Sequence, residues 1–349
     1  MKSTLAPALA TPWSTPAATT RVRRDLERSN LELASGRHAD MGLALGGRSH
    51  VLVSARAQES LLRGLQDNGA ISAGRLRVIQ QSLEGAVTGA QDFMDALVPL
   101  KSGQGSPVQA AAHAKAALED FFGMMNATAE GSHVFGGRNI TRAPLAQYFS
   151  DPPPPSRQSV ENAFQARFGF AISDPAAASI SAADMHDFLD NDFAALFSPA
   201  QWKANWSSAT DNAVTTLISL SEIAPVTASA NNPAVRKLAM AYVMTAGLGI
   251  ETLNGAARKV VADEAFQLTA EAVTGLDGMR GEIGVRQERL KRAGDRLEIQ
   301  RGLVRKEIAG MEQIDPHEAA ASVNALSVQL QTSYAITGRL QKLSLLNYL

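Results

Sequence analysis

Two glycine-rich stretches are the places where this sequence could bind a phosphate group. The stretch "GLALGGRS" (42–49) resembles a Walker A loop, but it has one residue too few between its glycines, and Arg48 stands where that loop needs lysine. The stretch "VFGGRN" (134–139) could form an anion-binding nest of backbone N–H groups. Neither stretch lies in a strand–loop–helix pattern. We therefore interpret the first as a flexible joint and the second as the turn of a β-hairpin, in which two glycines supply positive φ.

An acidic stretch and a tryptophan pair are the other candidates for chemistry. The stretch "ADMHDFLDND" (183–192) could be a metal cluster, but it holds a single histidine, and its apolar residues fall on one face of a helix. We predict an amphipathic helix with solvated acids. Trp202 and Trp206 could form a sugar-binding platform, although their i, i+4 spacing favours core residues. No Gly-x-Ser-x-Gly elbow is present. We predict no catalytic, cofactor-binding or metal-binding residue, and no enzyme.

Composition narrows the class of protein further. The chain has 349 residues, of which 45% are hydrophobic and only 5% aromatic, which favours long Ala/Leu-rich helices over a β-sandwich. The net charge of −1 gives no field that would attract nucleic acid or an anionic membrane. The absence of cysteine excludes disulfides and thiolate zinc sites. No apolar run reaches membrane-spanning length, and prolines interrupt the N-terminus where a secretory signal would need an apolar core.

The N-terminal part of the chain reads as helices joined by a glycine-rich segment. A helix over 21–35 places Val22, Leu26 and Leu33 on one stripe, and the break over 36–50 follows it. A long helix is then predicted from about Ser49 to Leu100, and another over 108–129. Two columns of apolar residues repeat every seven residues in the long helix, which indicates coiled-coil-like packing. These columns are Leu76, Leu83, Ala90 and Leu97, and Ile79, Ala86, Phe93 and Leu100.

The C-terminal part repeats this helical pattern after a different middle region. The stretch "SDPPPPS" (150–156) predicts a stiff polyproline linker, and residues 156–260 carry most of the tryptophan and read as a separate, mostly helical compact domain. Heptads return from Asp263, and Asp315–Pro316 breaks that helix. The heptad residues are Ile283, Leu290, Leu297, Val304 and Met311. A last helix over 317–347 carries an apolar stripe that includes Leu326, Leu330, Leu340 and Leu343.

Three stretches resemble the bacterial flagellin superfamily. The first is "LELASGRHADMGLALGGR" (31–48), which is similar to the segment from the first helix to the joint. The second is "GSHVFGGRNITRAPL" (131–145), which resembles a hairpin of the hook–filament junction proteins and related flagellins. The third is "NALSVQLQTSYAITGRLQKLSLLNYL" (324–349), which resembles the terminal helix. The resemblance covers about 20–146 and 263–349, and no family is suggested for the middle region.

This resemblance completes the predicted architecture. We expect a mainly α fold, in which both chain ends form a long coiled-coil-like helical bundle with a short β-hairpin and an inserted, mostly helical outer domain. The predicted segments are a disordered export head (1–20), the N-terminal half of the flagellin-like core (21–146), the inserted domain (147–262) and the C-terminal half of the core (263–349).

The resemblance also implies a function. Such proteins are structural subunits that are exported through the flagellar type III channel and assemble outside the cell in the flagellum, through folding of their terminal helices. The implied partners are the chain itself, hook-associated proteins and flagellin, with an export chaperone on the C-terminal helix. The stretch 131–145 and the proline-rich head, which lacks the usual start of filament flagellins, favour the junction protein. The filament flagellin is the alternative.

The resemblance assigns two sets of functional residues. We expect an assembly interface between the terminal helices, formed by Val22, Leu26, Leu33, Leu326, Leu330, Leu340 and Leu343. The hairpin and joint residues are Gly36, Gly46, Gly47, Phe135, Gly136, Gly137 and Pro144. On this reading, Leu340→Asp should leave an exported monomer that does not assemble.

A second class of function remains open. The chain could be a secreted surface binding module, in which the helices are a stalk and the tryptophan-bearing insert binds a glycan or another partner. Deletion of 152–260 is expected to separate the two readings, because assembly should survive the deletion on the structural reading and binding should vanish on the other.

Overall fold

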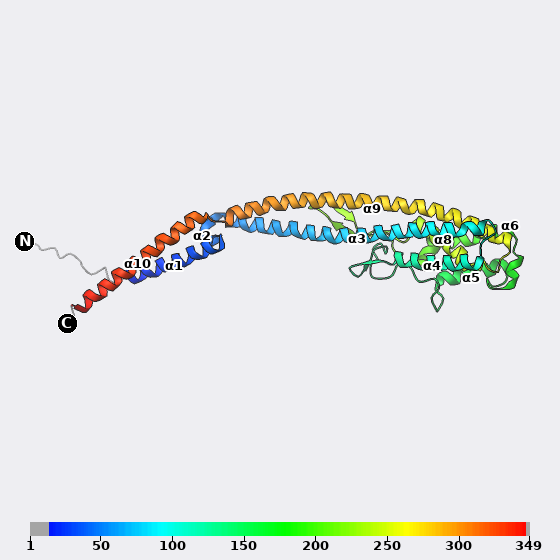
Figure 1. The fold of residues 1–349 in the computed structure, drawn as a ribbon, viewed down its shortest axis with the longest axis horizontal. Helices are drawn as coiled ribbons and strands as arrows, with labels where there is room; N and C mark the ends of the chain where they lie inside the picture. Colours follow the sequence, from blue (N-terminus) through cyan, green and yellow to red (C-terminus); the bar gives the residue numbers. More distant parts are fainter. Residues whose placement is uncertain (1–13, 347–349) are drawn as a thin grey trace, which may run out of the picture. The chain divides into compact units, whose positions relative to one another are not determined.

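The computed structural model is mainly α-helical, as predicted, and it describes the backbone of residues 14–346 and the side chains of residues 17–339 (Figure 1). The helices of four or more residues in α geometry are α1 (Ser14–Ser35), α2 (Met41–Leu45), α3 (Ser49–Lys101), α4 (Pro107–Met125), α5 (Pro155–Phe168), α6 (Ala182–Asp187), α8 (Pro233–Gly247), α9 (Gly255–Glu312) and α10 (Pro316–Leu346). Within the described part of the chain, no helix is both long enough and apolar enough to cross a membrane.

Short elements connect these helices. They are the helical turns η1 (Gly46–Arg48), η2 (Pro175–Ser179) and α7 (Pro199–Gln201), the π-helical segments η3 (Phe188–Phe193) and η4 (Trp202–Trp206), and the strands β1 (Thr128–Ala129), β2 (Ser132–His133), β3 (Thr215–Leu217) and β4 (Ile223–Pro225). The strands form two separate antiparallel pairs, β1 with β2 and β3 with β4.

The chain divides into two compact units. The terminal unit consists of 1–63 and 298–349, and the central unit consists of 64–297. The long helices α3 and α9 contribute residues to both units. The predicted head, 1–20, falls partly outside the described residues. Its last residues, Ser14–Thr20, are helical, so α1 begins seven residues before the expected start at Arg21. Pro16 is compatible with this start, because a proline in the first turn costs no helical hydrogen bond.

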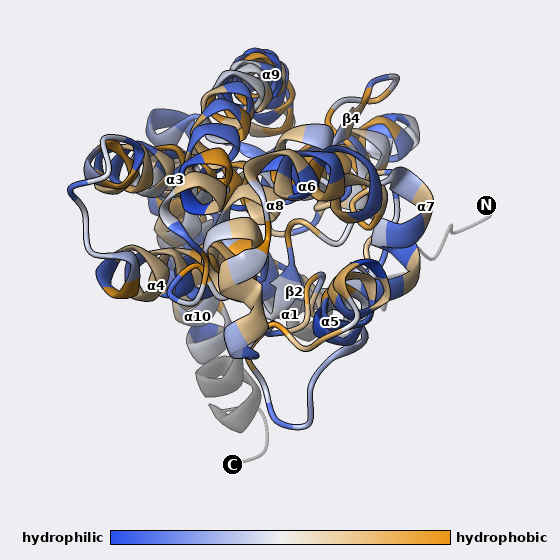
Figure 2. Ribbon diagram, turned by 90° about the vertical axis from the view of Figure 1, so that its right-hand side faces the viewer, coloured by the Kyte–Doolittle hydropathy of each residue, from blue (hydrophilic) through white to orange (hydrophobic). Residues whose placement is uncertain are grey.

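The central unit is built around the heptad columns of α3. All eight predicted column residues, from Leu76 to Leu100, are at most 3% exposed, which confirms the periodicity. The apolar helix α8 packs against α4, and ten of its fifteen residues are buried. Figure 2 shows α8 coloured mostly as hydrophobic, with α3, α4, α5 and α6 around it.

The inserted region does not form a core of its own. One continuous hydrophobic cluster joins residues of α3, α4 and α9 with residues of α5, α8 and the segments between them. Tyr242 of α8 packs edge-on against Phe93 of α3, with ring centroids 4.8 Å apart, and also against Phe121 of α4. The expectation of a separate compact domain over 156–260 is therefore corrected. Deletion of 152–260 would uncover the core of α3 and α4, so it cannot test binding separately from folding.

The β-hairpin lies at a different place from the one predicted. Strands β1 and β2 enclose the two-residue turn Glu130–Gly131, in which both residues have positive φ (51° and 76°), as a type I′ turn requires. The predicted turn at Gly136–Gly137 instead belongs to a tight loop, in which the N–H of Asn139 donates to the C=O of Gly136 (3.0 Å). The sequence predicts the turn at Gly136–Gly137 because two adjacent glycines are a stronger turn signal than Glu130–Gly131.

Candidate assembly site

The terminal helices α1 and α10 lie side by side in the terminal unit (Figure 1). Val22 is 8% exposed and Ser29 is 6% exposed, and the hydroxyls of Ser29 and Ser322 are 3.4 Å apart. Ser29 therefore faces α10, and Val22 lies seven residues before it, on the same side of α1.

The predicted interface residues are unequally covered. Val22 is buried, Leu26 of α1 is half-buried, and Leu33 is 38% exposed. Leu326 and Leu330 of α10 are half-buried. The side chains of Leu340 and Leu343 lie outside the part of the chain whose side chains are described. The structure thus brings together only some members of the set, and none of the described side chains of α10, residues 316–339, is buried.

A tight joint follows α1 and meets the junction of α9 and α10. Gly36 has φ of +70° and donates its N–H to the C=O of Glu32 (2.8 Å), which ends the helix in the left-handed conformation that glycine favours. The N–H of His38 then donates to the C=O of Glu312 (2.9 Å), and the N–H of Ile314 donates to the C=O of Gly36 (3.2 Å). These main-chain bonds hold the end of α1 against the end of α9.

A buried carboxylate fixes the same joint. Glu312 is 4% exposed, and its carboxylate accepts from Arg56 Nε (2.8 Å) and lies 3.2 Å from Arg37 Nη1. A carboxylate this deeply buried needs such charged donors to offset its lost hydration. Sequence reasoning missed this cluster. The break at Pro316 and the glycine at 36 mark the joint, but no pattern in one sequence links Arg56 to a residue 256 positions away.

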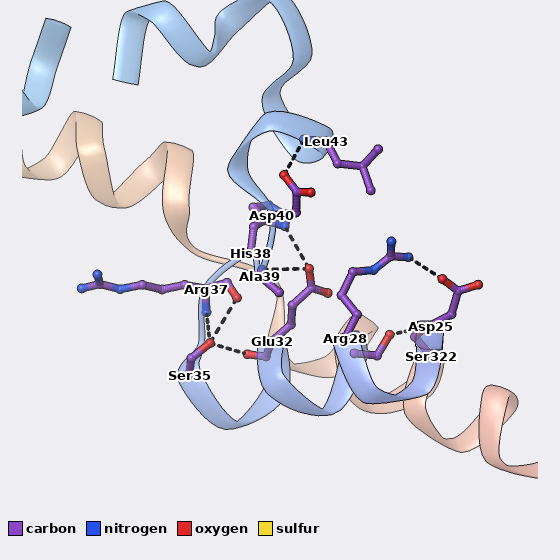
Figure 3. A network of polar contacts seen from close by, with 11 residues as sticks. Asp25, Arg28, Glu32, Ser35, Arg37, His38, Ala39, Asp40, Leu43 and Ser322 are labelled. Atoms are coloured by element: carbon purple, nitrogen blue, oxygen red, sulfur yellow. Dashed lines mark hydrogen bonds and ion pairs between the residues drawn. The ribbon is translucent and has the colours of Figure 1, made fainter. Parts of the chain in front are cut away.

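Polar contacts also fix the turn between α1 and α2 (Figure 3). The carboxylate of Glu32 accepts from the N–H of Ala39 (3.1 Å). Asp40 is the N-cap of α2 and accepts from the N–H of Leu43 (3.0 Å). These contacts give the segment between α1 and α2 a defined conformation in this structure.

The remaining joint glycines act through their backbone conformation and not through close packing. Gly46 has φ of +53° at the end of α2, whereas no positive φ occurs at Gly47. A Cβ atom at Gly36, Gly46 or Gly47 would meet nothing within 4 Å. Substitution at Gly36 and Gly46 would therefore cost backbone strain only.

Helices α3 and α9 are paired by charge within the terminal unit. Glu59 accepts from Arg301 Nε (2.7 Å) and lies 3.3 Å from Arg305 Nε. The hydrogen bond from Arg301 is the main cause that lowers the pKa of the Glu59 carboxyl, and the charge of Arg305 adds to it.

The double glycine of the central unit allows close backbone approach. The N–H of Gly137 donates to the C=O of Ala228 (2.9 Å), and a Cβ at Gly137 would lie 2.1 Å from the C=O oxygen of Thr210. A Cβ at Gly136 would lie 2.1 Å from the oxygen of Asn139. Phe135 beside them is fully buried. The double glycine thus binds the chain after β2 to the inserted region. It does not form an anion-binding loop in this structure, because the N–H of Gly137 already donates to Ala228.

Pro144 takes part in the same contact. It is buried, and its C=O accepts from the N–H of Ser208 (2.9 Å). The hydroxyl of Ser208 donates to the C=O of Ala143 (2.8 Å). The stretch 131–145 is therefore an anchoring segment for the insert over most of its length.

The other candidates for chemistry are structural in their contacts. Met185 and Phe188 of the acidic stretch and Phe193 directly after it are fully buried, as the amphipathic reading predicts, although residues 188–193 are π-helical. Its acids pair with basic groups: Asp187 with Arg167, and Asp190 with His186 at 3.0 Å. No group of three or more potential ligands with metal-binding geometry occurs among the described residues.

The tryptophan pair belongs to the core. Trp202 and Trp206 stack with centroids 5.4 Å apart and are 0% and 4% exposed. They therefore cannot present an open platform to a sugar ring, and the core prediction for them is confirmed.

The fold and the site define a class: a structural protein whose two chain ends pair as helices at a shared joint. Family comparison agrees. Residues 7–140 match the bacterial flagellin N-terminal helical region, and residues 266–349 match the bacterial flagellin C-terminal helical region. Together the two regions cover more than half of the chain. The chain belongs to the bacterial flagellin superfamily, and it is a structural subunit of the extracellular flagellum, where such subunits associate with one another and with other axial proteins.

One solved structure with a similar fold is a "putative flagellar hook-associated protein" from Vibrio parahaemolyticus. It is 10% identical to this chain, with a TM-score of 0.50, and the match covers 76% of this chain and 97% of that one. At this identity the likeness concerns the fold alone. A comparison with curated protein sequences finds no significant match.

Proposed function

We propose that the protein is the subunit of the hook–filament junction, and that its terminal helices complete their folding as it assembles. The observation that carries the second part is the absence of a buried side chain in the described part of α10, residues 316–339. A helix of this length needs an apolar partner surface, because helix propensity alone gives little stability in water.

Exposed apolar side chains on both terminal helices point to that partner. Among the described side chains of α1 and α10, the large exposed ones are Leu31 (59%), Leu33 (38%), Val328 (62%), Tyr334 (55%) and Ile336 (49%). Neighbouring subunits in a helical array would cover them. The ordering entropy of the two helices is then compensated only on assembly, which keeps the exported chain monomeric beforehand.

The proposed interface keeps the residues predicted from the sequence. Val22, Leu26 and Leu33 would pack against Leu326 and Leu330, and Leu340 and Leu343 would extend the same stripe toward the end of α10. Before export, a chaperone would cover this stripe, because exposed apolar surface of this extent favours aggregation.

The junction role is favoured over the filament role by the stretch 131–145, whose Phe135, Gly136, Gly137 and Pro144 resemble the junction proteins. A binding module with a helical stalk loses its main support, because Trp202 and Trp206 lie in the core.

Seeded assembly tests the role directly. Purified monomer is mixed with short hook or filament seeds, and the products are imaged by electron microscopy, with Leu330→Asp as a variant that places a charge at the interface. The junction role predicts that the protein adds to the seeds as a short cap, and that the variant does not add. Long filaments would identify a filament flagellin, and no attachment to any seed would contradict an axial role.

A further inference from the structure

A polar cavity lies over α5 in the central unit, apart from the terminal helices. It has a volume of about 390 Å³, within the range of small-molecule sites. Its wall is formed by α5, by the segment after α5 and by the end of α8. Nothing in the packing of α1 with α10 involves this cavity.

An unpaired phenol lies in the wall of the cavity. Tyr148 is 2% exposed, and among the described residues none forms a hydrogen bond with its hydroxyl. Burial raises the pKa of this phenol well above its usual range, so the hydroxyl stays protonated and able to donate. A ligand in the cavity that supplies an acceptor would give this hydroxyl a hydrogen-bond partner.

The other polar groups of the cavity are neutral or mutually neutralised. Arg157 Nε donates to the carboxylate of Glu161 (2.8 Å), so the two charges offset each other. Asn162 and Gln165 each add an amide with donor and acceptor atoms. This set can exchange several hydrogen bonds with a ligand but offers no uncompensated charge to a phosphate or a carboxylate.

Gly247 of α8 lies close to the phenol. A Cβ at this position would lie 3.0 Å from the Tyr148 hydroxyl, so a larger residue there would crowd the hydroxyl. Phe149 packs edge-on against Tyr148, with centroids 4.9 Å apart, and adds half-buried aromatic surface to the wall. An apolar ring beside neutral donors and acceptors suits a ligand that has C–H faces as well as hydroxyls.

We propose that this cavity binds a neutral polyhydroxylated ligand, such as one sugar residue of a glycan, with the Tyr148 hydroxyl as a hydrogen-bond donor to it. The site would give the subunit a contact with surface carbohydrate. The proposal does not depend on whether the subunit belongs to the junction or to the filament.

The test uses full-length monomer and saturation-transfer NMR with glucose, galactose, mannose and N-acetylglucosamine as probes. At least one probe should bind saturably. Tyr148→Phe should weaken that binding about tenfold, as the loss of one buried hydrogen bond does, and Gly247→Ala should abolish it. Tyr334→Phe, the same chemical change at an exposed position of α10, should have no effect.

A stability readout separates a ligand site from a structural phenol. Tyr148→Phe should leave the melting temperature nearly unchanged, because no described group of the protein loses a hydrogen bond with it. The proposal is overturned if none of the four sugars binds, if both cavity variants bind like the parent, or if Tyr148→Phe lowers the melting temperature as the loss of an internal hydrogen bond would.

Discussion

At the scale of single residues, the joint depends on one buried carboxylate. Glu312 is nearly inaccessible, whereas Arg37 and Arg56 keep much of their surface in water. Its removal therefore takes away two charge-assisted contacts and leaves the arginines solvated, which keeps the cost moderate.

We predict that Glu312→Gln lowers the local opening free energy of the joint by about 1–3 kcal/mol, since charge-assisted hydrogen bonds become neutral ones. Hydrogen exchange of the amide of His38, which donates to the C=O of Glu312, measures this in the assembled protein. Glu307→Gln on the exposed face of α9 is the matched control and should change nothing. Equal exchange in both variants would show that the main-chain bonds alone hold the joint.

A second single-residue effect depends on pH. Glu222, between β3 and β4, accepts from Arg289 Nε (2.5 Å) and lies 3.1 Å from Arg296 Nη2. The Arg289 hydrogen bond is the main cause that lowers the pKa of the Glu222 carboxyl below its ordinary value of 4.5. The contact therefore stabilises the hairpin fully above that ordinary value, and its contribution is lost as pH falls through the lowered folded value.

We predict that β3 and β4 become more susceptible to proteolysis as pH falls below the ordinary carboxyl value of 4.5, measured with a protease that is active at both neutral and acidic pH. Glu222→Gln should show the increased cleavage already at neutral pH and little further change on acidification. Glu282→Gln, which loses only an exposed pair with Arg286, should behave like the parent. A parent whose cleavage is independent of pH would contradict the role of this carboxylate.

At the scale of elements, a comparison of Gly137 with Gly131 separates the cost of backbone strain from the cost of a steric clash. Both Gly137 and Gly131 have positive φ, at 63° and 76°. A Cβ at Gly137 would collide with the backbone of Thr210, whereas a Cβ at Gly131 would meet nothing within 4 Å.

We predict that Gly137→Ala lowers the free energy of unfolding of the central unit by about 3–5 kcal/mol, because strain and a backbone clash add. Gly131→Ala should cost only about 1–2 kcal/mol, the strain alone. Urea unfolding followed by circular dichroism measures both. Equal losses in the two variants would show that the loop moves away from Thr210 at little cost.

Heptad positions are the part of the fold that the sequence predicts best. Leu83, Ala90 and Leu97 are fully buried because a seven-residue repeat places them on one face whatever lies opposite. The hairpin at Glu130–Gly131 was misplaced, because local turn preferences do not reveal that Gly136 and Gly137 approach the backbone of Thr210. Contacts between distant residues leave no periodic signal in one sequence.

The same limit applies to the candidate site. Val22 and Leu330 follow from helical periodicity, but the pairing of Glu312 with Arg56 is set by where two long helices end. The inserted region was expected to fold alone because its aromatic content differs. Tyr242 illustrates why the region does not fold alone. Its ring, from the inserted region, packs against Phe93 of α3 and Phe121 of α4, so the two parts share one core.

At the scale of the whole molecule, the two units differ in how far their apolar side chains are buried. The central unit has a continuous core with many fully buried aromatic rings. The terminal unit pairs α1 with α10 but leaves apolar residues of both helices exposed. A self-assembling subunit built this way keeps a stable central unit in the monomer and completes the terminal unit only among its neighbours.

Hydrogen exchange measured by mass spectrometry, on monomer and on seed-assembled protein, tests this claim most directly. We predict that residues 17–35 and 316–339 exchange within seconds in the monomer and become strongly protected after assembly, while the amides of α8 are protected in both states. Strong protection of α1 and α10 already in the isolated monomer would contradict coupled folding and would show that the terminal pair is stable without neighbours.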